Sequence, residues 1–222
     1  MSTRVKICGL RNEAQLDAAL QAGADLVGFV HYPKSPRHVN LETASALIAH
    51  ARAQGRAETV LLAVNPDDAL VDRIAAEVKP DILQLHGNET PERAAAIRRR
   101  SGLTILKAVP VADTGEVTAA AAYLEPEGGA DVLLFDAKPP ADPAALPGGN
   151  GLAFDWHILE SAKGGAPFAL AGGLTPENVA AAIRLTGAAI VDVSSGVESR
   201  PGEKDPLLMR RFLRAAKAAK QS

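Results

Sequence analysis

Two side chains that can exchange protons each end a short hydrophobic run of this 222-residue sequence. Cys8, the only cysteine, closes the run RVKIC, and Asp136 follows the run DVLLF. A deprotonated thiol can act as a general base, and a carboxyl group held in apolar surroundings can stay protonated and act as a general acid. The pair could therefore catalyse proton transfer. The alternatives are that Cys8 is a small buried hydrophobic residue and that Asp136 caps a loop.

Glycines and serines follow the last two hydrophobic runs and could bind a phosphate. The motif LAGGL contains Gly172 and Gly173, and the motif VDVSSGVE contains Ser194, Ser195 and Gly196. Backbone N–H groups and hydroxyls of such loops bind anions, and glycine lets the backbone approach the ligand closely. The alternative is that these glycines only permit tight turns. Because both motifs follow the seventh and eighth predicted strands, we predict a phosphate site there.

Further polar residues could bind the rest of a substrate. Arg37, in SPRHV, could bind a carboxylate through two hydrogen bonds, although it could also be an ordinary exposed loop residue. Lys6 lies two residues before Cys8, so it should share the inner face of the strand, need a buried partner and favour the thiolate. The predicted substrate-binding residues are Lys6, Arg37, His86, Gly149 and Asp192. No metal site is predicted, because the first strand lacks the His-x-His pattern of metal-dependent barrels.

The elements that must position these residues alternate between hydrophobic runs and Ala-rich helical segments. The predicted strands cover residues 4–8, 25–30, 59–64, 81–85, 103–109, 131–135, 167–171 and 188–194, and most are continuous Val, Ile and Leu runs typical of buried parallel strands. The predicted helices include 12–23, with Asn12 as N-cap and Gly23 as its end, and a segment starting near Pro66. Eight strand–helix units predict an α/β fold with residues 1–222 forming a single (β/α)8 TIM barrel domain.

An open doubly wound sheet is the alternative fold. It usually carries a glycine-rich dinucleotide-binding turn after its first strand, whereas this sequence has CGLRNE there. In a closed barrel, the sixth strand lies three steps from the first, or about 135° around the mouth, with the seventh and eighth strands between. The proposed acid and base would then flank the phosphate site. The long loop over 137–151 is expected to close over the substrate.

Composition argues against two classes of partner. The formal net charge of −2 and an aromatic content of 4% give no basic or stacking surface for nucleic acid. No run approaches the roughly 18 apolar residues of a membrane helix, and the first residues lack the apolar stretch of a signal peptide. We therefore expect a cytoplasmic protein that binds neither nucleic acid nor membrane. We also expect it to form a monomer or a weak homodimer.

Taken together, the motifs resemble those of the phosphoribosylanthranilate isomerases of tryptophan biosynthesis. The matching stretches, in order along nearly the whole chain, are KICGL, SPRHV, QLHG, FDA, GGNGLAFDW, LAGGLTPENV and VDVSSGVE with PGEKD. The resemblance implies a (β/α)8 barrel that needs no cofactor, binds a small-molecule phosphoribosyl substrate and carries out an Amadori rearrangement. It also implies that Cys8 is the general base, that Asp136 is the general acid and that Arg37 binds the anthranilate carboxylate.

Two other functions remain possible on the residues alone. One is a different phosphosugar enzyme, such as an aldolase that forms a Schiff base through Lys107 in ILKAV. The other is a non-catalytic barrel that binds phosphosugars for regulation, which would need the phosphate loops but no acid and base.

Overall fold

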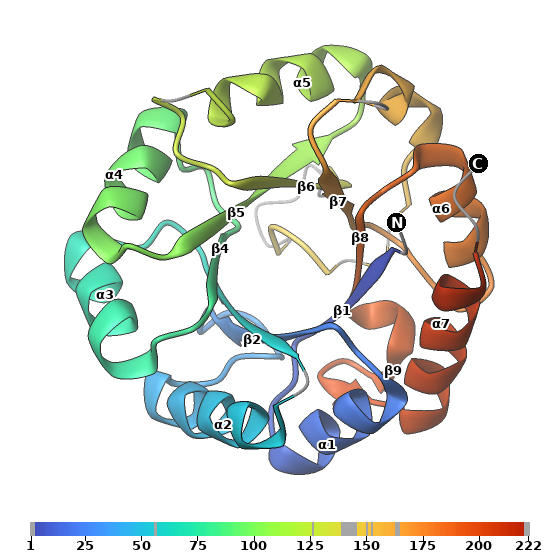
Figure 1. Cartoon of the computed structure of the whole chain (residues 1–222), viewed down its shortest axis with the longest axis horizontal. Coiled ribbons are helices and arrows are strands. Elements are labelled where there is room, and N and C mark those ends of the chain that lie inside the picture. The colour runs from blue at the N-terminus through green and yellow to red at the C-terminus, as the bar shows by residue number, and fades with distance from the viewer. Residues whose placement is uncertain are drawn as a thin grey trace.

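The computed structural model describes residues 3–55, 57–125, 127–138, 146–149, 151, 153–162 and 165–219. Eight parallel strands close into a barrel in the order β1 to β8, and helices surround it (Figure 1). The predicted (β/α)8 fold is confirmed, and the open doubly wound alternative is wrong, because β8 pairs with β1.

The strands of the barrel are β1 (Arg4–Cys8), β2 (Leu26–His31), β3 (Glu58–Ala63), β4 (Ile82–Leu85), β5 (Thr104–Val111), β6 (Val132–Ala137), β7 (Phe168–Leu170) and β8 (Ile190–Val193). The α-helices are α1 (Glu13–Ala22), α2 (Leu41–Gln54), α3 (Asp68–Arg73), α4 (Pro91–Ser101), α5 (Thr114–Ala119), α6 (Val179–Thr186) and α7 (Pro206–Ala218). Shorter elements are the π-helical turn η1 (Ile74–Val78), the 3₁₀ helices η2 (Ala120–Tyr123), η3 (Trp156–Ala162) and η4 (Ser195–Val197), and a hairpin of β9 (Glu198–Arg200) with β10 (Glu203–Lys204).

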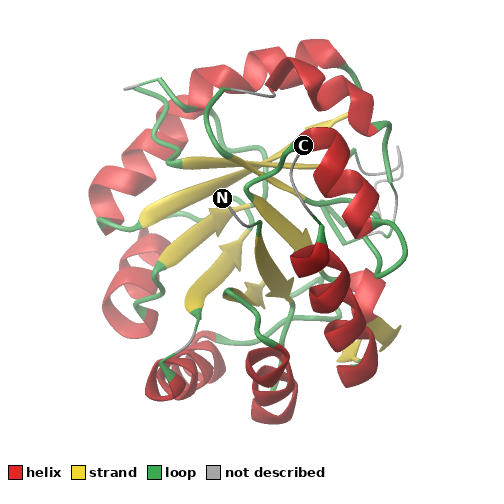
Figure 2. Ribbon diagram, turned by 45° about the vertical axis from the view of Figure 1, so that its right-hand side comes forward, coloured by secondary structure: helices red, strands yellow, loops and turns green. Residues whose placement is uncertain are grey.

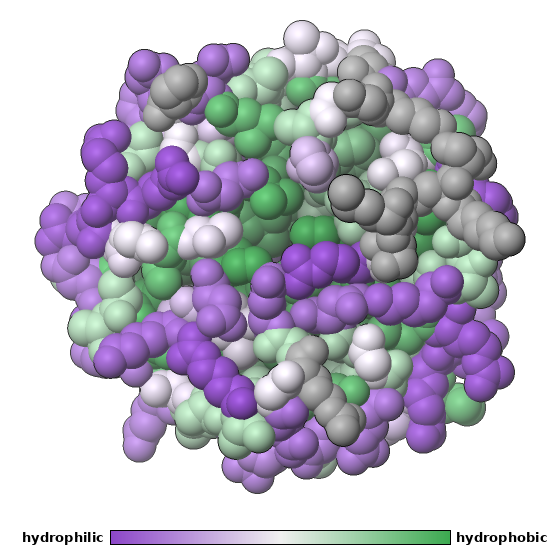
Figure 3. All heavy atoms as spheres, viewed as in Figure 1, coloured by the Kyte–Doolittle hydropathy of each residue, from purple (hydrophilic) through white to green (hydrophobic). Residues whose placement is uncertain are grey.

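The barrel strands have buried side chains on both faces, because successive side chains alternate between the barrel interior and the surrounding helices. In β2, Val27 and Phe29 belong to the core between strands and helices, whereas Leu26 belongs to a separate inner cluster. The same alternation separates Leu61 from Val60 in β3. Figure 2 shows the helices outside the ring of strands, and Figure 3 shows hydrophilic residues over the outer ring with hydrophobic residues toward the centre.

Local capping sets the ends of α1 as predicted. The Asn12 side chain accepts a hydrogen bond from the backbone N–H of Gln15, and Gly23 ends the helix in the left-handed conformation with φ of 92°. The helix expected to start near Pro66 instead begins at Asp68, because the Asp67 side chain caps it by accepting from the N–H of Leu70.

The sixth strand–helix unit differs from the prediction, since the 3₁₀ helix η3 stands where an α-helix was expected. Asp155 holds its start by accepting hydrogen bonds from the backbone and ring nitrogens of His157. The buried side chain of Leu159 anchors the segment to the core. Because α5 and α6 both contact η3, this short element is enough to cover the barrel between them.

Among the described helices, none is long and apolar enough to cross a membrane.

Candidate active site

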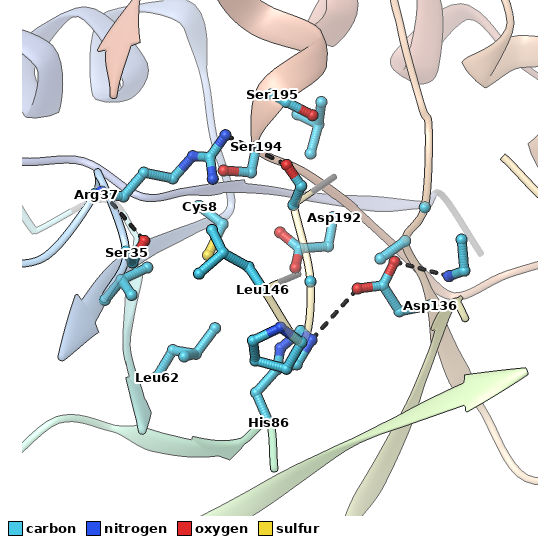
Figure 4. A pocket seen from close by; sticks show the side chains of 18 of the residues that line it. Cys8, Ser35, Arg37, Leu62, His86, Asp136, Leu146, Asp192, Ser194 and Ser195 are labelled. Carbon is cyan, nitrogen blue, oxygen red and sulfur yellow. Dashed lines mark hydrogen bonds and ion pairs between the residues drawn. The ribbon is translucent and has the colours of Figure 1, made fainter. Parts of the chain in front are cut away.

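A pocket of about 800 Å³, including the part open to solvent, lies at the C-terminal ends of the strands. Figure 4 shows Arg37 and Asp136 on opposite sides of it, with Cys8 and Asp192 between them. All predicted site residues except Lys6 line this pocket, namely Cys8, Arg37, His86, Asp136, Gly149, Gly172, Gly173, Asp192, Ser194, Ser195 and Gly196. The structure therefore brings together residues from β1, β6 and β8 and from the loops after β2, β4, β6, β7 and β8.

Lys6 lies behind the pocket and acts on Cys8 and Asp192. Its side chain is fully buried, and Nζ donates to Oδ2 of Asp192 at 2.9 Å. The buried partner expected for Lys6 is thus Asp192. Burial disfavours the charge on Lys6, but the attraction of Asp192 and Cys8 outweighs burial and raises the pKa of Lys6. Oδ1 of Asp192 is buried and has no partner in the part of the chain that the structure describes, so it is free to accept a hydrogen bond from a ligand.

The Cys8 thiol is 4% exposed and closes β1 at the pocket wall. Burial raises the pKa of this thiol, and the attraction of Lys6 lowers it only in part, because the Asp192 carboxylate acts in the opposite direction. The net pKa of Cys8 is raised. The expectation that Lys6 favours the thiolate is correct in sign, but in the protein without ligand the thiol form prevails.

Asp136 faces His86 across the other side of the pocket. Oδ2 of Asp136 lies 3.3 Å from Nε2 of His86, and Oδ1 accepts from the backbone N–H of Ala137 at 2.8 Å. The amide nitrogen of Gln84 lies 2.9 Å from Nδ1 of His86. If this amide donates to Nδ1, as its assigned orientation indicates, the ring proton is on Nε2 and points to Asp136. A Cβ atom on Gly148 would lie 2.4 Å from Nε2 of His86, so the loop packs directly over this pair.

The loops after β7 and β8 form the predicted phosphate-binding end of the pocket. The N–H groups of Gly172 and Gly173 donate to no backbone or side-chain acceptor within the described ranges, whereas the carbonyl of Gly173 is held by the side chain of Asn178. The two loops touch at Gly196, where a Cβ atom would lie 1.9 Å from the carbonyl oxygen of Leu174. Only glycine fits there.

Arg37 reaches the pocket from the loop after β2 but is not an exposed loop residue. Its guanidinium is nearly buried, and Nε and Nη2 each donate to a carboxylate oxygen of Glu198 at 2.8 Å. Gly9 makes room for the Arg37 side chain: it has φ of 83°, and a Cβ atom there would lie 2.6 Å from Cδ of Arg37. The turn directly after Cys8 thus depends on glycine for two independent reasons.

Sequence reasoning missed Glu198 and Lys204, which belong to the hairpin β9–β10. The motif that carries them, VDVSSGVE with PGEKD, was visible, but charged residues in a turn-rich segment are usually exposed. Here Lys204 is completely buried and donates to Glu198 at 2.6 Å.

Lys107 does not line the pocket. Its ammonium donates at 2.7 Å to both Glu89 and the carbonyl of Gly87, and it lies 5.7 Å from the ring centre of Tyr123. Burial lowers the pKa of Lys107, although Glu89 opposes that shift. Because this amine is committed to a buried ion pair outside the pocket, the structure does not support the Schiff-base aldolase.

The predicted closure of the loop after β6 and the predicted lack of a metal site can be compared with the described residues only. The closure of the loop over 137–151 involves residues 139–145 and 150, which lie outside the described residues. Within the described ranges, Gly149 places its carbonyl oxygen 3.5 Å from Nη2 of Arg37. No group of three or more His, Cys, Asp or Glu side chains suited to a metal ion occurs among the residues described.

Comparisons with known proteins agree with the motif resemblance. The sequence profile of the family described as N-(5′-phosphoribosyl)anthranilate (PRA) isomerase matches residues 5–215. Relatives named N-(5′-phosphoribosyl)anthranilate isomerase include one from Paracoccus denitrificans, 56% identical over 98% of this chain and 99% of the relative, and one from Parvibaculum lavamentivorans, 50% identical over 99% and 100%.

Solved structures give the same result. The phosphoribosyl anthranilate isomerase of Thermotoga maritima superposes with a TM-score of 0.85 at 34% identity, covering 97% of this chain and 98% of that one. Sequence, fold and pocket thus agree, and the chain belongs to the phosphoribosylanthranilate isomerase family.

Proposed function

We propose that Cys8 and Asp136 carry out the family's reaction, the conversion of N-(5-phosphoribosyl)anthranilate into 1-(2-carboxyphenylamino)-1-deoxyribulose 5-phosphate. The observation that carries this assignment is that a thiol from β1 and a carboxyl from β6 face one pocket, with the phosphate-binding loops of β7 and β8 between them. A substrate anchored by its phosphate would then lie between the two groups.

The first step opens the ribose ring. Protonated Asp136 gives its proton to the ring oxygen, the bond from that oxygen to C1′ breaks, and the anthranilate nitrogen forms a C=N bond to C1′. The carboxylate left behind is stabilised by the N–H of Ala137 and by Nε2 of His86, which already contact it. This contact favours the charge that develops on Asp136.

The second step removes the proton from C2′. The Cys8 thiolate takes this proton, and the electron pair forms the C1′–C2′ double bond of an enolamine while the C=N bond returns to a single bond. Tautomerisation then moves the proton of the C2′ hydroxyl to C1′ and gives the ketone. The raised pKa of Cys8 leaves a small thiolate fraction near neutrality, and Lys6 stabilises that fraction by its charge.

The remaining pocket groups bind the parts of the substrate that do not react. Arg37 binds the anthranilate carboxylate, and the phosphate accepts hydrogen bonds from the N–H groups of Gly172 and Gly173, with Ser194, Ser195 and Gly196 completing the site. The unpartnered Oδ1 of Asp192 suits a sugar hydroxyl. Gly149 closes the carboxylate end beside Arg37.

A ligand complex of a relative supports this assignment. A phosphoribosyl anthranilate isomerase, 33% identical with a TM-score of 0.82, was solved in complex with reduced 1-(o-carboxyphenylamino)-1-deoxyribulose 5-phosphate. That ligand carries a carboxylate at one end and a phosphate at the other, as Arg37 and the phosphate loops require.

The test is the loss of anthranilate fluorescence when the protein is added to freshly made phosphoribosylanthranilate. The Cys8→Ser and Asp136→Asn variants should each lose at least 100-fold in kcat, as expected for removal of a general base or acid, with a much smaller change in KM. Near-normal turnover in either variant would contradict the role of that residue.

Assembly and location are the remaining parts of the proposal. The phosphoribosylanthranilate isomerase of Thermotoga maritima is dimeric, and monomers generated from it have been solved. We expect this chain to form a monomer or a weak homodimer, because Leu207 is the one large hydrophobic side chain exposed among the described residues. Sedimentation velocity over a range of concentrations tests this; a stable dimer at nanomolar concentration would contradict it. The single-domain organisation and the cytoplasmic location stay predictions.

A further inference from the structure

The hairpin β9–β10 lies outside the barrel, yet it sends two charged side chains into the protein beside the pocket. The side chains of Glu198 and Lys204 are 4% and 0% exposed. Removing both charges from water costs free energy that their mutual attraction only partly recovers. Buried ion pairs of this kind therefore contribute little net stability compared with apolar residues. This arrangement suggests a role in the site.

Glu198 determines which edge of the Arg37 guanidinium faces the pocket. Its two carboxylate oxygens accept from Nε and Nη2 of Arg37, both at 2.8 Å, and so occupy one side of the planar group. The opposite edge, formed by Nη1 and the second hydrogen of Nη2, lies against Gly149 at the pocket wall. Nη2 donates there to the carbonyl oxygen of Gly149 at 3.5 Å, a long hydrogen bond that a bound carboxylate would replace when it accepts from Nη1 and Nη2.

Lys204 connects the same carboxylate to the phosphate-binding loop. Its ammonium donates to Oε1 of Glu198 at 2.6 Å, to the carbonyl oxygen of Ser194 at 3.0 Å and to the hydroxyl oxygen of Ser194 at 3.2 Å. These three contacts use the three donors of the ammonium. Arg37 and Ser194 are therefore held by one buried pair, although they lie in the loops after β2 and β8.

The charges of the three groups also suit an anionic ligand. Two cations, Arg37 and Lys204, share one anion, Glu198, so the group carries a net charge of +1 next to the pocket. Burial opposes the charge on Glu198, but hydrogen bonds from Arg37 and Lys204 outweigh it and lower the pKa of Glu198. The carboxylate therefore stays ionised near neutrality.

We propose that Glu198 and Lys204 are positioning residues that hold Arg37 and Ser194 in one frame, so that the pocket selects ligands carrying a carboxylate and a phosphate at a fixed separation. This inference rests on the proposed roles of Arg37 and Ser194. It adds two residues of the β9–β10 hairpin to the machinery of the site and assigns them to specificity instead of proton transfer.

A double-mutant cycle tests the carboxylate half. Glu198→Gln should raise KM for phosphoribosylanthranilate about tenfold, with a smaller change in kcat, because the guanidinium loses its fixed orientation. In an Arg37→Ala background the same substitution should change KM little, because Glu198 acts through Arg37. An unchanged KM in Glu198→Gln, or an equal rise in both backgrounds, overturns the inference.

The Arg37→Ala variant alone separates this inference from the function on which it rests. If its KM is unchanged, Arg37 does not bind the carboxylate, and the proposed function fails at that point together with the inference. If its KM rises and Glu198→Gln behaves like the wild type, only the inference fails. N-(5-phosphoribosyl)aniline, which lacks the carboxylate, should bind equally well to wild type and Glu198→Gln.

Inorganic phosphate as a competitive inhibitor tests the phosphate half. Lys204→Met should raise its inhibition constant about tenfold, because Ser194 loses two contacts. This readout is independent of Cys8, whose thiolate Lys204 also attracts. An unchanged inhibition constant overturns the link between Lys204 and the phosphate loop.

A substitution elsewhere in the same hairpin serves as the control for loss of folding. Glu203→Gln removes a half-exposed carboxylate of β10, 4.0 Å from Arg200, and should leave KM and phosphate inhibition unchanged. Glu198→Gln leaves the buried Lys204 ammonium without its carboxylate partner, so Glu198→Gln/Lys204→Met is included as a variant that removes both members of this pair. It should unfold cooperatively near the wild-type temperature and still show both defects; wild-type KM and phosphate inhibition in this folded variant would overturn the inference.

Discussion

Lys6 and Asp192 form an ion pair across β1 and β8, with Nζ 2.9 Å from Oδ2, and both charges act on the Cys8 thiol. Burial and Asp192 raise the pKa of Cys8, while Lys6 lowers it. Without ligand, the proposed base is therefore mainly a thiol near neutrality, and the Lys6 cation lies close enough to stabilise the thiolate when it forms.

The pH dependence of Cys8 alkylation follows from this arrangement. The rate of reaction with iodoacetamide should rise with a midpoint above about 8.5, the ordinary value for a free cysteine, because only the thiolate reacts. Asp192→Asn should lower that midpoint, since it removes an anion and leaves the Lys6 cation. Because Cys8 is the only cysteine, the urea-unfolded chain gives the reference midpoint. A native midpoint at or below the unfolded one would contradict the raised pKa.

His86 is expected to support Asp136 through its Nε2 atom, which lies 3.3 Å from the carboxylate. His86→Ala should lower kcat about tenfold, the effect expected for loss of one hydrogen bond to a developing charge. His86→Gln is the matched control, because its side-chain nitrogen can occupy the place of Nε2 and should restore most of the activity. Equal activity in both variants would show that the donor at this position does not matter.

Lys107 is expected to stabilise the fold through its ion pair with Glu89 and to take no part in catalysis. Lys107→Met should lower the free energy of unfolding by about 3 kcal/mol or more, because it leaves the Glu89 carboxylate buried without its cation. The Lys107→Met/Glu89→Gln double variant should recover part of that loss. Borohydride treatment of the wild-type protein with substrate should give no protein-linked adduct, and an adduct on Lys107 would revive the aldolase.

The strands and the main chemical groups of the pocket could be predicted because their signals are local. Val60 and Leu61 point to opposite faces and are both buried, so the strand appears as a continuous hydrophobic run. Asn12 and Gly23 mark the ends of α1 through contacts within a few residues. Cys8 and Asp136 were found because a barrel places strand ends at one rim.

The parts that could not be predicted depend on contacts between distant segments. Glu198 meets Arg37 from 161 positions away, and this contact turns an apparently exposed arginine into a buried one. The state of the Cys8 thiol depends on Asp192, which only the closure of β8 onto β1 brings near. Composition and spacing carry no information on such pairings.

Asp81 provides a test of stability at the opposite end of the barrel from the pocket. Its Oδ2 accepts from the backbone N–H and the hydroxyl of Thr59 at 2.7 and 2.6 Å, and its Oδ1 accepts from Arg52 at 2.9 Å. Burial opposes ionisation, but these hydrogen bonds outweigh it and lower the pKa of Asp81. Asp81→Asn should therefore cost about 1 kcal/mol of unfolding free energy at pH 7, reduced by the partial exposure of the group, with kcat and KM unchanged.

The sign of the pH effect distinguishes this contribution from a packing defect. A carboxyl whose pKa is lower in the folded protein stabilises it above the unfolded value of about 3.9, and that stability is lost as the pH falls through the folded pKa. The difference between wild type and Asp81→Asn in urea unfolding should thus be largest near neutrality and shrink below about pH 4. Asp72→Asn, which removes an exposed partner of Arg100, should change stability little at any pH. A difference for Asp81→Asn that stays constant down to pH 2.5 would mean that the carboxylate charge does not stabilise the fold.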